Sequence, residues 1–145
     1  MSLPRTYLFK AGKWSAYRSD IHDYMHRWIF STPWGMLRLH HILRSDDDRD
    51  LHDHPADFAS LILAGGYQEV VHGKLAVNVY GPFSVVRRKA EDLHRIMLNK
   101  YFDHIKDCEV SAWTLVWMHP RRREWGFLKE DTGEWIHHDK YFKDS

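Results

Sequence analysis

Short hydrophobic segments separated by turn residues follow one another along most of this chain, and their spacing limits the possible fold more than any other feature. The segments cover residues 36–44, 58–63, 67–71, 75–80, 84–88, 94–98, 113–118, 123–128 and 134–137. Several of them end at Gly or Pro, as at Gly65-Gly66 and Gly81-Pro82. Strands of this length with this punctuation predict an all-β barrel or sandwich.

The first 35 residues carry a different pattern. Between residues 20 and 30, hydrophobic side chains recur three or four positions apart, at Ile21, Tyr24, Met25, Trp28 and Ile29. This is the spacing of an amphipathic helix. We therefore expect one domain over residues 1–145, with a short helix or arm over 1–35 and a β-barrel over 36–137.

Composition and charge exclude several classes of protein. The chain has 145 residues, 43% of them hydrophobic, and a net charge of +1, which gives no field that would attract nucleic acid or a membrane surface. No run of eighteen hydrophobic residues and no signal-peptide core is present. The single cysteine, Cys108, fits a reducing compartment. We expect a cytoplasmic protein with neither a nucleic-acid partner nor a membrane partner.

Three histidines form the strongest functional pattern. His52 and His54 stand one residue apart, so on a strand their side chains point to the same face. His94, on a later strand, would complete a three-histidine site with open positions, as a catalytic metal requires. The alternative is that His52 and His54 are ordinary strand-end residues hydrogen-bonded to Asp50 or Asp53.

The same residues resemble the cupin superfamily of small jelly-roll β-barrels. The first cupin motif is commonly written G-x5-H-x-H-x3,4-E-x6-G, and His52, His54 and Gly65 fit its spacing. Phe58 stands at the position of the glutamate, and Asp46 at that of the leading glycine. The second motif is looser, with Gly81 and His94 at its ends. The resemblance covers residues 36 to 128.

The resemblance also implies the chemistry. Within cupins, a site of three histidines without glutamate is similar to that of the thiol dioxygenases, which use Fe(II). One divalent transition metal is therefore expected, Fe(II) first, with Zn, Mn or Ni as alternatives. Phe58 cannot form the cysteine–tyrosine cross-link that some of those enzymes carry, so a thiol substrate is not implied.

Other polar groups were considered for roles around the metal. Glu69, on the strand after Gly65-Gly66, could orient a histidine ligand through its free ring nitrogen, or could be solvated. Asp57 is expected at the surface or behind a ligand. Of the adjacent pair His40 and His41, one must face the interior, as a packed residue rather than a substrate contact. His41 is also a candidate general base.

The expected substrate is a small, anionic molecule. Arg88 and Arg123 are candidates to bind its charged group, and Phe58 and Tyr67 to line its pocket. Arg123 could instead form a surface ion pair with Glu124.

Three functions remain open at this stage. They are an oxygenase, a metal-assisted isomerase or hydrolase, and a non-catalytic ligand-binding barrel. Because small barrels expose edge strands, a homodimer is expected.

Overall fold

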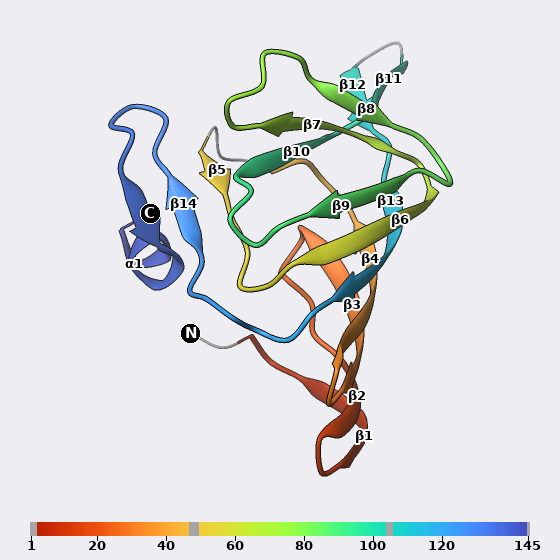
Figure 1. Cartoon of the computed structure of the whole chain (residues 1–145). Coiled ribbons are helices and arrows are strands. Elements are labelled where there is room, and N and C mark those ends of the chain that lie inside the picture. Colours follow the sequence, from red (N-terminus) through yellow and green to blue (C-terminus); the bar gives the residue numbers. More distant parts are fainter. Residues whose placement is uncertain (1–2, 47–49, 104–105, 145) are drawn as a thin grey trace.

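The computed structural model describes residues 3–46, 50–103 and 106–144, which fold into two facing antiparallel sheets (Figure 1). The elements are β1 (Thr6–Ala11), β2 (Trp14–Arg18), β3 (Met25–Thr32), β4 (Gly35–Ile42), β5 (Leu51–His52), β6 (Phe58–Ala64), β7 (Tyr67–Val71), β8 (Asn78–Tyr80), β9 (Val85–Arg88), β10 (His94–Leu98), β11 (Lys100–Asp103), β12 (Lys106–Glu109), β13 (Ala112–Met118), β14 (Gly126–Leu128), β15 (Trp135–His137) and α1 (His138–Lys143).

One sheet has the order β1-β2-β3-β4-β13-β6-β9, and the other has the order β15-β14-β5-β10-β7-β8. β11 and β12 form a separate hairpin. Some neighbouring strands are far apart in the sequence: β13 lies between β4 and β6, and β5 lies between β14 and β10. The all-β prediction is confirmed. No helix in the described ranges is long and apolar enough to cross a membrane.

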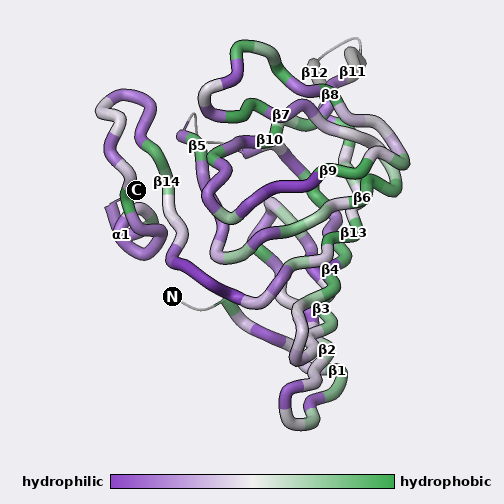
Figure 2. The backbone as a smooth tube through the Cα atoms, viewed as in Figure 1, coloured by the Kyte–Doolittle hydropathy of each residue, from purple (hydrophilic) through white to green (hydrophobic). Residues whose placement is uncertain are grey.

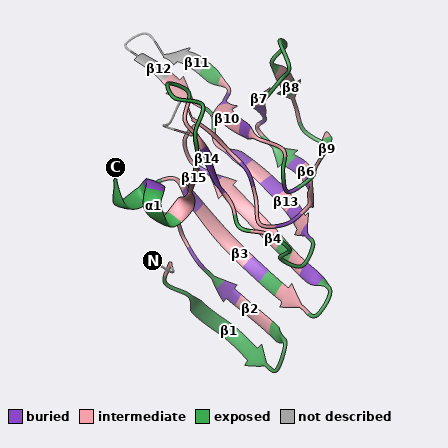
Figure 3. Ribbon diagram, turned by 60° about the vertical axis from the view of Figure 1, so that its left-hand side comes forward, coloured by how far each residue is buried: buried purple, intermediate pink, exposed green. Residues whose placement is uncertain are grey.

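The core lies between the two sheets, and β13 shows how the sequence produces it. Its buried residues alternate with partly buried ones, because successive side chains on a strand point to opposite faces. Met25, Ile42, Ile62 and Val86 from the same sheet pack together with Leu98 from the opposite sheet. Figure 3 shows this buried interior, and the contrasting exposure of β1 along its whole length.

The helix predicted over residues 20–30 is wrong. Residues Met25–Thr32 form β3, which pairs with β4 along its full length. Met25 and Ile29 face the core, whereas Trp28 faces outward and stacks on Trp113, with ring centroids 5.8 Å apart. A strand with hydrophobic residues on both faces can reproduce helical spacing, which explains the error.

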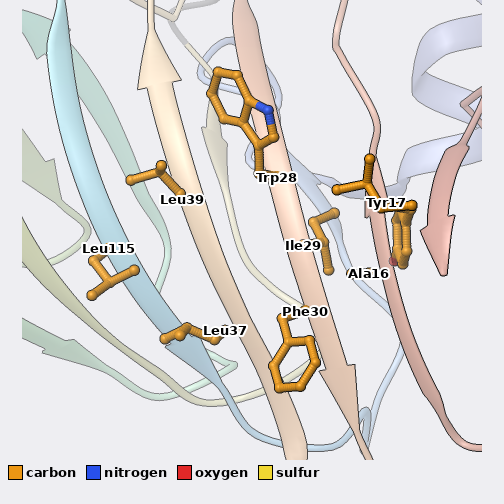
Figure 4. Close-up of a pocket in the computed structure, with 9 residues that line it drawn as sticks. Ala16, Tyr17, Trp28, Ile29, Phe30, Leu37, Leu39 and Leu115 are labelled. Carbon is orange, nitrogen blue, oxygen red and sulfur yellow. The ribbon is translucent and has the colours of Figure 1, made fainter.

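The outer face of the seven-stranded sheet is also hydrophobic. Figure 4 shows Trp28, Leu37, Leu39 and Leu115 along a shallow hollow on this face, contributed by β3, β4 and β13. The barrel interior lies on the other side of the same strands, so this hollow is not part of the histidine site.

Candidate metal centre

The three predicted histidines come together between the sheets. The ring centroids are 5.1 Å apart for His52 and His54, 4.8 Å for His52 and His94, and 4.9 Å for His54 and His94. One ring nitrogen from each lies within 4.8 Å of the other two. Bonds of about 2.1 Å to one ion would need nitrogens roughly 3 Å apart, which small side-chain rotations can provide.

Backbone pairing explains why these residues meet. His52 ends β5 and lies directly opposite His94 at the start of β10. His54 follows after Asp53, whose side chain points the other way and is 2% exposed. Asp53 accepts hydrogen bonds from the Gly126 amide (2.7 Å) and Trp135 Nε1 (3.0 Å). It thereby fixes the segment between the two histidines to β14 and β15.

Glu69 holds His94 in place. It is fully buried on β7, and its Oε1 lies 2.5 Å from Nδ1 of His94. Arg88 also donates to this carboxylate, with Nε 3.0 Å from Oε1 and a second contact through Nη2. Burial would raise the pKa of Glu69, but the hydrogen bonds from His94 and Arg88 outweigh it and lower this pKa to about 2.

The nitrogens left over fit a metal ion. With Nδ1 of His94 directed at Glu69, its Nε2 is buried and has no hydrogen-bond partner in the described chain. Nδ1 of His54 is buried and unpartnered in the same way. Burial lowers the pKa of His54 well below its usual value and that of His52 to about 4, so both imidazoles stay neutral, which is the form that binds metal. Unpaired buried nitrogens are unfavourable unless a ligand occupies the site.

Asp46 is a residue that our sequence analysis did not assign to the site. Its Oδ2 lies 3.9 Å from Nδ1 of His52, and it also accepts from the Tyr24 hydroxyl (2.5 Å) and the Ile96 amide (2.7 Å). It occupies the motif position where cupins carry the leading glycine. A carboxylate six residues before the first histidine is the sequence signal that could have identified it.

Phe58 lies against the cluster. Its ring is 4.7 Å from that of His54 and 6.1 Å from that of His94. The position of the missing glutamate is therefore next to the histidines, and it is filled by a hydrophobic ring. The metal would receive three neutral ligands from these side chains.

The other predicted contacts lie elsewhere. Arg123 does not face the cluster, because its Nη1 lies 2.7 Å from the buried carboxylate of Asp53. Asp57 accepts from the Ala90 amide and from Arg122, near the surface. His41 lies on the outer face, stacked on Trp113 with centroids 4.1 Å apart.

Tyr67 is buried in the core, and burial together with the charge of Glu69 raises its pKa. Its phenol therefore keeps its proton and packs within the barrel. Arg88 is committed to Glu69, so its charge is already neutralised. Of the residues predicted to contact substrate, Phe58 is the one whose ring contacts the histidine cluster.

Comparisons with known structures agree with this fold. The chain is similar to a cupin-2 domain protein, Rru_A2000 from Rhodospirillum rubrum, with a TM-score of 0.59 and 14% identity over 90% of this chain and 85% of that one. It is similar to KdgF from Halomonas sp. (TM-score 0.51, 15% identity, 72% and 88% of the two chains). It is also similar to an RmlC-like cupin from Shewanella frigidimarina (0.53, 14%, 82% and 96%). No protein-family model and no curated protein matches the sequence.

Proposed function

The chain has the cupin fold and a histidine cluster suited to a divalent metal, and from these we propose that it is a mononuclear metal-dependent cupin that uses Fe(II) to oxygenate a small anionic substrate. The observation that carries the proposal is the near-equilateral triangle of His52, His54 and His94, in which His54 and His94 each have a buried ring nitrogen without a partner in the described chain. Fe(II) held by three neutral imidazoles would supply O₂ chemistry at the positions that the protein leaves open.

The chain's own residues have supporting tasks in this proposal. Glu69 fixes the ring of His94, and Arg88 keeps Glu69 ionised. Asp53 holds the segment between the other two ligands. Phe58 excludes water from one side of the cluster and leaves no protein carboxylate at that position.

A non-redox isomerase or hydrolase needs a general base near the metal. Of the two groups predicted for this role, His41 is on the outer face of the sheet. The carboxylate of Glu69 is hydrogen-bonded to His94 and Arg88, which lower its pKa. Neither is available to accept a proton from a substrate, which favours the oxygenase.

Elemental analysis tests the proposal. Untagged protein purified without oxygen should contain near-stoichiometric iron, and the His94→Ala variant should lose it. His72→Ala is the matched control, because His72 is exposed in a turn and should not affect metal content. Iron-loaded protein should then consume O₂ when candidate substrates are added.

Each other result has a distinct meaning. Zinc, nickel or manganese in place of iron would favour the non-redox enzyme. No metal in any of the proteins, even after reconstitution, would refute a metal site and leave a ligand-binding barrel.

The predicted homodimer stays a prediction. The hydrophobic outer face of the seven-stranded sheet, where Leu37 is 37% and Phe30 39% exposed, supports it. Sedimentation analysis of the wild type and of Leu37→Lys would test it.

A further inference from the structure

Two arginines point into the barrel without an acidic partner. Arg27 lies opposite His40 across β3 and β4, and Arg38 lies two residues before His40 on the same inward face of β4. Nε of Arg38 is buried and has no hydrogen-bond partner in the described part of the chain, and its Nη2 donates to Sδ of Met36 at 3.4 Å. Arg27 donates to the carbonyl and hydroxyl of Ser19, both neutral acceptors. Among the residues described, neither guanidinium pairs with a carboxylate.

This contrasts with the arginines named from the sequence. Arg88 is neutralised by Glu69, and Arg123 by Asp53. Both side chains are partly buried, and a partly desolvated charge is unfavourable when no ion pair repays its desolvation. Burial lowers the pKa of Arg38, and lowers that of Arg27 to about 10 with the charge of Arg38 adding to the effect. A ligand that supplies negative charge would remove this penalty.

A cavity reaches Arg38. Its volume is about 390 Å³, within the range of small-molecule sites. Of the described residues that line it, none is Asp or Glu, and four are cationic or can become so: Arg5, Arg38, His119 and Arg121. Arg121 forms an exposed ion pair with Glu124, with Nη2 2.7 Å from Oε2. Arg38 is therefore the more buried arginine of this cavity that has no acidic partner.

The cavity shares a wall with the histidine cluster. Pro55 and Ala56, which follow His54 directly, line it. Met118 lines it too, and lies opposite Phe58, the ring that contacts His54. Figure 1 shows the chain after β13 running across the end of the barrel towards β14, and Figure 2 shows that this segment is strongly hydrophilic. The cavity is thus lined by Arg121 from this hydrophilic segment and by Pro55 and Ala56 from the segment that follows His54.

We propose that this cavity is an anion-binding site in which Arg38 holds a carboxylate or phosphate group of the substrate. A guanidinium forms two parallel hydrogen bonds to either group, which fixes its orientation. Arg5 and Arg121 would add positive charge at the mouth, and the rest of the substrate would extend along Met118 and Phe58 towards the metal. Only the extension of the substrate towards the metal rests on the proposed function; anion binding by Arg38 does not.

The test measures thermal unfolding and calorimetric binding with three probes: succinate, inorganic phosphate, and succinamide as the uncharged control, all at one ionic strength. Metal-free and zinc-loaded proteins are compared. The melting temperature of the wild type should rise with succinate or phosphate and should not change with succinamide. Arg38→Met should abolish this rise in melting temperature. Without anion it should itself melt no lower than wild type, because it removes a half-buried charge that has no acidic partner. Arg87→Met, which removes an exposed arginine from β9, should behave as wild type.

The outcomes separate the possibilities. A rise in melting temperature with succinate alone indicates a carboxylate substrate. A rise with phosphate alone indicates a phosphate ester, and a rise with both indicates a general anion site. The proposal would be overturned if an anion raised the melting temperature of Arg38→Met as much as that of the wild type, or if it raised neither. If Arg38→Met does not fold, Arg38→Lys should retain a reduced gain, and Arg5→Met a partial one. Zinc binding measured in parallel shows whether the metal site fails independently.

Discussion

Replacing Glu69 by Gln should weaken both the fold and the metal site. The pKa of this buried carboxylate falls from 4.5 to about 2, which corresponds to roughly 3 kcal/mol of preferential stabilisation of the charged form. Gln has nearly the same shape but cannot carry that charge, and it leaves Arg88 without a counter-ion. We expect a loss of about 3 kcal/mol in the free energy of unfolding, in line with the breaking of a buried ion pair.

The assay is urea denaturation of metal-free protein at neutral pH, followed by zinc titration against a chromogenic chelator. Zinc affinity should fall about 10- to 100-fold, because His94 loses the group that orients it. Glu91→Gln is the matched control. Its ion pair with Arg122 is solvent-exposed, so the substitution should change the free energy of unfolding much less than Glu69→Gln does and should leave zinc binding unchanged.

The pH dependence gives an independent check. The folded-state pKa of Glu69 lies below the unfolded value, so its stabilising contribution is complete above pH 4.5 and is lost as the pH falls towards 2. The stability difference between wild type and Glu69→Gln should shrink over that interval. If the variant unfolds at the wild-type urea concentration and binds zinc equally well, the role assigned to the Glu69–Arg88 pair is refuted.

Three further changes have specific expected outcomes. Gly65→Ala should destabilise by more than Gly73→Ala in urea titrations: both have positive φ, but a Cβ at Gly65 would lie 2.3 Å from the Ser111 carbonyl oxygen, whereas one at Gly73 meets nothing within 4 Å. Asp53→Asn should cost about 1–3 kcal/mol in the same assay, and an unchanged midpoint would show that its contacts to β14 and β15 are dispensable. Burial and nearby arginines lower the pKa of His40 to about 3, so this residue should contribute a loss of stability of up to about 1.4 kcal/mol per pH unit as the pH drops from 6.5 towards 3. His52 and His54 contribute in the same direction, so His40→Gln should reduce the slope without abolishing it, and an identical slope would contradict the role of His40.

The sequence allowed the barrel and the histidines to be predicted because both depend on local patterns. β6, β7, β10 and β13 lie close to the segments expected, since each alternates or runs hydrophobic between turn residues. β5 was missed because it has only two residues, and β3 because hydrophobic residues lie on both of its faces. Local pattern contains no information about what covers a face from a distant part of the chain.

The same limit applies to charged residues. The sequence placed Arg88 and Arg123 near the site, but their partners, Glu69 and Asp53, are 19 and 70 residues away. Arg38 sits in an ordinary strand pattern, and only the three-dimensional structure shows that its Nε lacks a partner. Whether an arginine is free to bind substrate is decided by such long-range pairing.

The position of β14 against β5 also sets the order in which the site can mature during synthesis. His52 and Asp53 leave the ribosome long before Gly126 and Trp135, which fix the segment between the histidines. The large sheet likewise cannot join β4 to β6 until β13 has been made. A nascent chain therefore exposes three histidines without a rigid frame, and the histidine cluster is held in place only after nearly the whole domain has emerged.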